Sequence, residues 1–136
     1  MSVDRAQRLF LLAMGVGLLP VALSYGGIPE KSLPLLYGIS APDLPTRHVF
    51  RAVMGLYLGM ICFWLAGVVL PRMRRAALWT VLVFVTGIAL GRVLSLGLDG
   101  WPSSILVFYL VAEIALALTC LALLTRSPDR ATEGRA

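Results

Sequence analysis

The chain has 136 residues, of which 59% are apolar and 14% charged, and its mean hydropathy is +0.87. Soluble domains are usually about half apolar and about a quarter charged, so this composition excludes an ordinary soluble domain and predicts one integral membrane domain. The net charge is +5, but the basic residues gather at the ends of the apolar segments. Membrane topology explains that placement, so nucleic-acid binding is not indicated.

Four apolar segments are long enough to cross a bilayer as helices, which requires about 20 residues each. They cover residues 9–28, 48–70, 76–98 and 105–125. We therefore predict an all-α fold, a four-helix membrane bundle that uses residues 1–136 as a single domain. Within it, the small-residue pairs Gly55/Gly59 and Gly87/Gly91 have the spacing that permits close helix approach.

The connections between these segments differ in length and polarity. Residues 29–47 contain four prolines and are not expected to form one continuous helix. Their apolar, aromatic middle favours the mouth of the bundle, either as a functional lid or as a passive interfacial loop. Residues 71–75 are predicted to form a tight basic turn, residues 99–104 a short polar turn, and residues 126–136 a polar, disordered tail.

The distribution of basic residues predicts the topology, because positive residues mark the cytoplasmic side. One side receives Lys31, Arg47 and Arg51. The other side receives eight arginines, at positions 5, 8, 72, 74, 75, 126, 130 and 135. Both termini are therefore expected in the cytoplasm, and the proline-rich loop and the Asp99 turn on the outer side.

Charged and hydroxyl-bearing residues lie near the outer ends of the last two segments. Arg92, Ser95 and Asp99 share one helix face, since they are three and then four residues apart. Tyr109 and Glu113 are four apart and share a face of the next helix. An antiparallel hairpin that turns at residues 99–104 places Glu113 within reach of Arg92, so we predict an ion pair with Tyr109 as its neighbour.

Three further residues are predicted to complete an outward-facing pocket at this ion pair. Arg51 would come from the second segment, His48 would lie at the rim, and Trp101 would line the mouth. Two arginines against Glu113 make the predicted site net positive, which suits an anionic or carbonyl-bearing head group on an apolar body. The structural alternative is an ion pair that only fixes the helix register.

The sequence gives no reason to expect a metal or another cofactor. His48 is the sole histidine, and the two cysteines, Cys62 and Cys120, lie apart in different apolar segments. A metal site in a protein of this kind needs three or four such ligands close together.

Three stretches carry a resemblance to a known family. They are HVFRAVMGLYLGM (residues 48–60), RAALWTVLVFVTGIALGRVLSLGLDGWPS (residues 75–103) and YLVAEIALA (residues 109–117). The chain resembles the bacterial membrane family called domain of unknown function number 4345, and more distantly the layout is similar to the DoxX proteins. The resemblance implies a multi-pass protein of the bacterial inner (cytoplasmic) membrane but no activity. The matching positions are Arg51, Gly55, Tyr57, Arg92, Ser95, Asp99, Gly100, Pro102 and Glu113.

Two kinds of function fit these residues. The first is a binding or accessory protein, whose partner is a lipid, a quinone, another amphiphile, a membrane-protein subunit or a second copy of the chain. The second is a small membrane enzyme in which Glu113 is the general acid or base and Asp99 or Tyr109 the complementary group, for example in an isomerisation or cyclisation. Transport has less support, because the chain has no inverted repeat.

Overall fold

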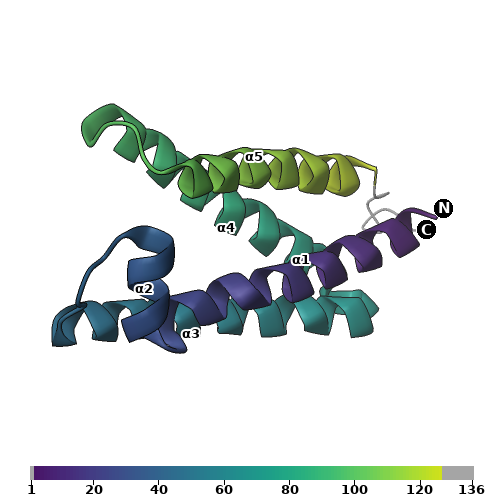
Figure 1. The fold of residues 1–136 in the computed structure, drawn as a ribbon. Helices are drawn as coiled ribbons and strands as arrows, with labels where there is room; N and C mark the ends of the chain where they lie inside the picture. The colour runs from purple at the N-terminus through teal and green to yellow at the C-terminus, as the bar shows by residue number, and fades with distance from the viewer. Residues whose placement is uncertain (1, 127–136) are drawn as a thin grey trace, which may run out of the picture.

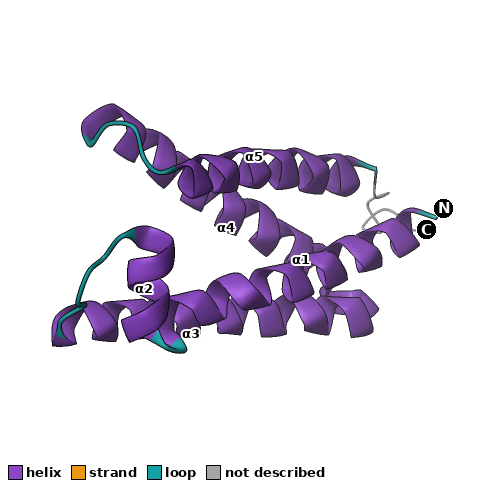
Figure 2. Cartoon of the chain, viewed as in Figure 1, coloured by secondary structure: helices purple, strands orange, loops and turns teal. Residues whose placement is uncertain are grey.

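The computed structural model describes residues 2–126, and within them it contains five α-helices and no strand (Figures 1 and 2). The helices are α1 (Val3–Gly26), α2 (Pro29–Tyr37), α3 (Leu44–Val69), α4 (Pro71–Leu98) and α5 (Ser104–Thr125). The predicted all-α class is confirmed. All but α2 are long and apolar enough to cross a membrane, so the chain is a small multi-pass membrane protein.

The long helices extend beyond the predicted apolar segments into their polar flanks. α1 begins at Val3 because the side chain of Ser2 accepts a hydrogen bond from the backbone N–H of Arg5. α3 begins at Leu44, where Asp43 Oδ1 accepts from Thr46 N at 2.9 Å. Hydropathy marks only the part of a helix suited to lipid, whereas capping residues decide where the helix begins. The predicted disordered tail lies outside the described residues from residue 127 onward.

The proline-rich connection contains a helix that the sequence did not predict. Pro29 occupies the first turn of α2, where a missing N–H costs no hydrogen bond. Gly38 ends the helix with φ of +70°, a left-handed conformation that glycine adopts without strain. Residues 38–43 then separate α2 from α3. The segment is therefore not one continuous helix, as expected, but most of it is helical, in α2 and in the first turn of α3.

The predicted basic turn at residues 71–75 is wrong, because these residues form the first turn of α4. Pro71 can begin the helix for the same reason that Pro29 can. The chain reverses at Leu70, whose backbone is extended and which alone separates α3 from α4.

Two helix pairs make up the molecule (Figure 1). α1 packs along α3, and α4 packs against α5 and α3, whereas α1 touches α4 and α5 more sparsely. The first residues of α1, the α3–α4 junction and the end of α5 lie together at one end, which we call the terminal end. The α4–α5 hairpin diverges from α1 and α3 towards the opposite end, the α2 end, where α2 and the α4–α5 turn lie.

The core lies where all four long helices meet. Its fully buried side chains include Leu11 of α1, Trp64 of α3, Leu78 and Val81 of α4 and Cys120 of α5. Trp64 Nε1 donates to Thr80 Oγ1 at 3.2 Å, and Thr80 Oγ1 donates to the carbonyl oxygen of Ala77. These bonds satisfy polar atoms that would be costly to leave unpaired in an apolar core.

Candidate functional site

The predicted ion pair between α4 and α5 is present. Arg92 Nε lies 3.0 Å from both Oε1 and Oε2 of Glu113 and donates to the carboxylate. The two side chains are only 19% and 13% exposed, respectively. The short turn between α4 and α5 sets this register, since it places the last two turns of α4 beside the start of α5.

Tyr109 lies beside the ion pair, one helical turn before Glu113. The Cζ atom of Arg92 is 5.6 Å from the centre of the Tyr109 ring, which is within the range of a cation–π contact. Nε is the only nitrogen of Arg92 that donates to a residue in the described part of the chain. Both Nη atoms thus hold donors without a protein acceptor among residues 2–126.

A pocket of about 70 Å³ adjoins the ion pair where α1, α3, α4 and α5 meet. Four of the side chains that line it are aromatic, one from each of these helices: Tyr25, Tyr57, Phe84 and Tyr109. The Tyr25 and Tyr57 ring centres are 5.4 Å apart, and those of Tyr57 and Phe84 are 5.0 Å apart, both edge-on. The remaining lining is aliphatic: Leu18, Val21, Val85, Ile88, Ala112 and Leu116. We call this space the tyrosine pocket.

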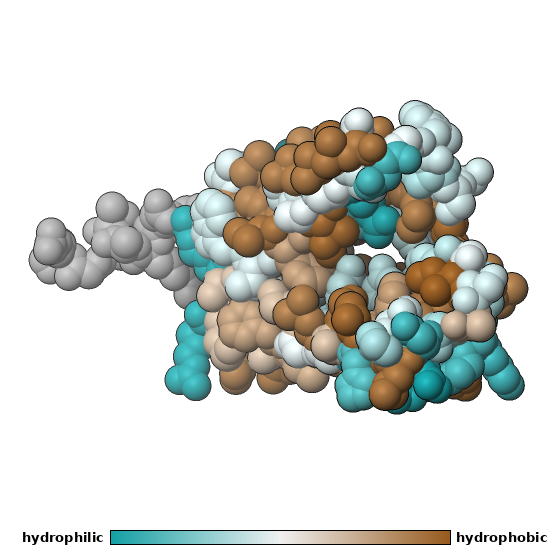
Figure 3. Space-filling view, turned by 90° about the vertical axis from the view of Figure 1, so that its left-hand side faces the viewer, coloured by the Kyte–Doolittle hydropathy of each residue, from teal (hydrophilic) through white to brown (hydrophobic). Residues whose placement is uncertain are grey.

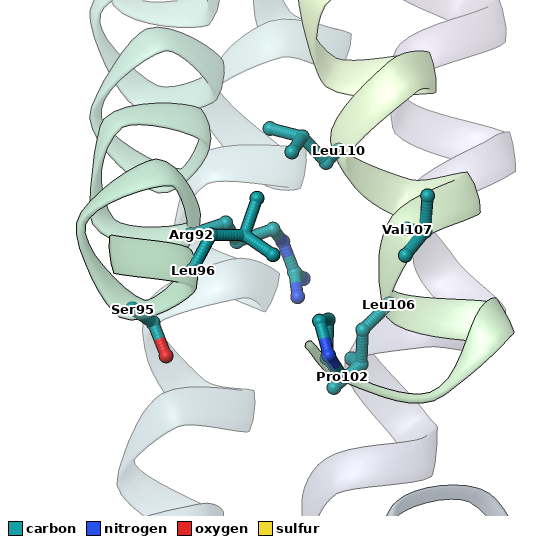
Figure 4. Close-up of a pocket in the computed structure, with 7 residues that line it drawn as sticks. All are labelled: Arg92, Ser95, Leu96, Pro102, Leu106, Val107 and Leu110. Carbon is teal, nitrogen blue, oxygen red and sulfur yellow. The ribbon is translucent and has the colours of Figure 1, made fainter. Parts of the chain in front are cut away.

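A second pocket, of about 60 Å³, lies on the other side of Arg92, between α4 and α5 near their turn (Figure 4). The view shows the Arg92 side chain extending into the space between the two helices, with Pro102 and Leu106 across from it. Arg92 is the residue that lines both pockets, so its side chain lies between them.

α2 is held beside the tyrosine pocket by Tyr37. The Tyr37 ring stacks on that of Tyr25 with their centres 5.4 Å apart, and its hydroxyl is 3.0 Å from the Ser24 hydroxyl. The Tyr37 side chain also interacts with that of Tyr109 on α5. Burial raises the pKa of Tyr37 above its ordinary value, so this phenol stays protonated at physiological pH.

An ion pair connects the first turn of α2 to α3. Glu30 Oε1 accepts a hydrogen bond from Arg47 Nη1 at 3.1 Å. A backbone hydrogen bond of Glu30 itself, followed by the bond from Arg47, lowers the pKa of this carboxyl. It is therefore ionised at neutral pH and helps to fix α2 over the ends of α1 and α3.

The structure places the other predicted residues in less central positions. Ser95 lines the second pocket, and its Oγ donates to Asp99 Oδ2 at 2.7 Å on an exposed face of α4. Trp101 is 83% exposed. His48 and Arg51 are exposed on α3 and line neither pocket. The participation of His48, Arg51, Asp99 and Trp101 in binding stays a prediction.

The position of Arg51 changes the charge of the site. Without Arg51 in the lining, the charged groups of the tyrosine pocket are Arg92 and Glu113, whose formal charges cancel. The lining residues therefore form a pocket with no net formal charge, whereas the sequence predicted a net positive one.

Sequence reasoning did not assign Tyr25 or Tyr57 to the site, although Tyr57 is among the positions that match the family pattern; the two residues supply two of the aromatic side chains that line the pocket. Both lie within apolar segments, where an aromatic residue is usually assigned to packing or to the lipid face. The available signal was the hydroxyl, because a polar atom deep in an apolar helix tends to face a partner or a cavity. Among residues 2–126, no group of three or more His, Cys, Asp or Glu side chains could hold a metal ion.

Comparison with known proteins gives a family but no activity. No protein of curated function and no solved structure matches the chain, so the more distant likeness to the DoxX proteins is not supported. The family described as Domain of unknown function (DUF4345) matches residues 6–124, which contain α2 to α4 whole and nearly all of α1 and α5. The chain therefore belongs to the DUF4345 family.

Proposed function

We propose that this protein binds an amphiphilic small molecule or lipid, with the polar head of the ligand at Arg92 and its apolar body among the lining helices. The observation that carries this proposal is that Arg92 lines both pockets while its two Nη atoms have no acceptor among the described residues. A guanidinium group in apolar surroundings is costly unless its donors are satisfied. A ligand oxygen would supply the missing acceptors through charge-assisted hydrogen bonds.

The proposed setting is a bacterial cytoplasmic membrane, with both termini inside and the α2 end outside. The basic residues around the terminal end support this orientation. In this arrangement the tyrosine pocket opens in the outer half of the bilayer, and α2 covers it from the aqueous side. Such a pocket would receive a ligand from the lipid more readily than from the cytoplasm.

The alternative, a small membrane enzyme that uses Glu113 as acid or base, has weaker support. Both carboxylate oxygens of Glu113 accept from Arg92, so the carboxyl group is already held by a partner within the protein. Glu113 is thus better suited to orienting Arg92 than to donating a proton. In an accessory role, a polar side chain of a partner subunit would accept the hydrogen bonds from the Nη atoms of Arg92 in place of a ligand.

Co-purification of the ligand tests the binding proposal. We would purify the protein from bacterial membranes in a mild detergent, extract it with organic solvent and identify the bound amphiphiles by mass spectrometry. The variant should replace both charges, Arg92→Met with Glu113→Leu, because an apolar substitute for a whole buried ion pair is often neutral for stability. Loss of a charge-assisted hydrogen bond predicts roughly a tenfold or greater fall in the amount of bound ligand.

Arg8→Met is the matched control, because Arg8 is exposed near the terminal end. It removes one positive charge without touching either pocket and should leave the bound amphiphile unchanged. Equal occupancy in the wild type and in the doubly substituted protein would contradict the proposal.

A further inference from the structure

The charges around the tyrosine pocket decide which head groups it can accept. Arg92 and Glu113 are its charged lining residues, and they neutralise each other. An anionic head would therefore add an uncompensated negative charge close to Glu113 in apolar surroundings. That is far more costly than an uncharged head, whose desolvation is offset by a few hydrogen bonds.

The pocket offers hydrogen-bond donors in excess of acceptors. Arg92 contributes the N–H groups of its two Nη atoms, whereas the lining residues Tyr25, Tyr57 and Tyr109 carry hydroxyl groups that can either donate or accept. The carboxylate of Glu113 is the strong acceptor, and it already accepts from Arg92 Nε. A fitting ligand must then present an acceptor oxygen, and a carbonyl oxygen can take two such hydrogen bonds.

The size of the pocket limits the head group. Its volume of about 70 Å³ is less than half of the roughly 150 Å³ of an engineered protein cavity that holds benzene. A sugar head group is larger than a benzene ring and does not fit inside. A single carbonyl group with its neighbouring atoms does.

The rest of the pocket is lined by aliphatic side chains from α1, α4 and α5, among them Val21, Ile88 and Leu116. α1 touches α5 only sparsely. Seen from the α2 end, the surface is hollowed between the part that contains the α4–α5 hairpin, above, and the part that contains α2 and α3, below (Figure 3). Because α1 and α5 make few contacts, a hydrocarbon chain attached to the head would leave sideways between these two helices, towards lipid.

We propose that the tyrosine pocket selects an uncharged amphiphile with a compact carbonyl head, such as an ester, ketone or aldehyde on a long hydrocarbon chain, and discriminates against the anionic head of the same length. This inference rests on the proposed binding function and narrows it to one class of ligand. Arg92 supplies the hydrogen bonds to the carbonyl oxygen, and Glu113 supplies the negative charge that excludes the anion.

Two probes with the same acyl chain, one uncharged and one anionic, test the inference. Methyl tetradecanoate and tetradecanoate carry the same acyl chain, one as an uncharged ester and one as a carboxylate. Their binding to the purified wild-type protein in detergent micelles would be measured by native mass spectrometry, with the same micelle concentration for both. The ester should bind at least tenfold more tightly than the carboxylate.

Glu113→Gln gives the complementary measurement. It keeps the shape of the side chain but leaves the positive charge of Arg92 unbalanced, so binding of the carboxylate should rise roughly tenfold relative to the ester. Arg8→Gln, which changes one exposed charge at a distance from the pocket, should alter neither value. A variant of Glu113 that fails to fold leaves the wild-type comparison intact.

The outcomes separate this inference from the function on which it rests. Tighter binding of the carboxylate to the wild type, with loss of that binding in the Arg92→Met, Glu113→Leu protein, would overturn the selectivity and retain the binding function. Equal binding of the two probes would likewise overturn the selectivity alone. If neither probe binds in a manner that depends on Arg92, and no amphiphile co-purifies, both proposals fail.

Discussion

Arg74 is the charged side chain that the structure buries most deeply in the described part of the chain, with 5% of it exposed. Its Nε donates to the carbonyl oxygen of Gly67 at 3.2 Å, its Nη2 to that of Val68 at 3.3 Å, and its Nη1 to Asp4 on α1. The last carbonyl groups of a helix have no partner within the helix. Arg74 therefore caps the end of α3 from the start of α4 and joins both to α1.

This arrangement predicts that Arg74 contributes to the free energy of unfolding, in addition to any effect of its charge on membrane topology. Arg74→Ala should lower the free energy of unfolding by about 3 kcal/mol, because it leaves buried carbonyl groups and a carboxylate without their donor. Asp4→Asn should cost about 1 kcal/mol or less, since Asp4 is 62% exposed. Thermal unfolding in detergent measures both. Arg72→Ala, at an exposed position two residues away, is the control, and an equal loss there would contradict the capping role.

Glycine has different consequences at different places along the helices. A Cβ atom at position 67 would lie 2.6 Å from Cβ of Ala77, and one at position 26 would lie 2.9 Å from Cα of Arg51. These are points where α3 closely approaches α4 and where α1 closely approaches α3. At Gly59, in contrast, no atom lies within 4 Å of such a Cβ, and the same holds for Gly55, Gly87 and Gly91. The predicted small-residue pairs are thus not used for close packing among residues 2–126.

The contrast predicts opposite effects for the same substitution. Gly67→Ala should destabilise the protein by roughly 1–3 kcal/mol, because the added methyl group forces α3 and α4 apart. Gly59→Ala should be neutral or stabilising by up to about 1 kcal/mol, because alanine is the better helix former and meets no neighbour. Thermal unfolding of the two variants in the same detergent makes the comparison, and a similar loss at both positions would argue against this packing.

Local sequence features predict some elements better than others. Residue counting across the short α4–α5 turn placed Glu113 within reach of Arg92, because a short connection fixes which residues of the two helices lie side by side. The same reasoning cannot find the contact between Asp4 and Arg74, which are far apart in sequence and meet only after α1 packs on α3. Likewise α2 was missed because its prolines suggest a loop, although proline in the first turn of a helix is favourable.

At the scale of the whole molecule, the charges divide between its two ends. Arg5 and Arg8 of α1 and Arg72 and Arg75 of α4 lie towards the terminal end, whereas the α2 end carries Lys31, Arg47 and Arg51. The pairing of Arg74 with Asp4 removes one positive charge from this count but leaves the excess at the terminal end. Positive residues are retained on the cytoplasmic side, so the difference predicts cytoplasmic termini.

Cysteine labelling in whole bacterial cells measures this orientation. Ser103 lies in the turn before α5, is exposed and makes no capping hydrogen bond through its side chain, so Ser103→Cys should leave the fold unchanged. A membrane-impermeant maleimide should label this cysteine in intact cells, but should label Ser2→Cys only after lysis. The unsubstituted protein is the control for Cys62 and Cys120, which lie within α3 and α5. Labelling of Ser2→Cys in intact cells, with protection of Ser103→Cys, would reverse the orientation and would place the tyrosine pocket in the cytoplasmic half of the membrane.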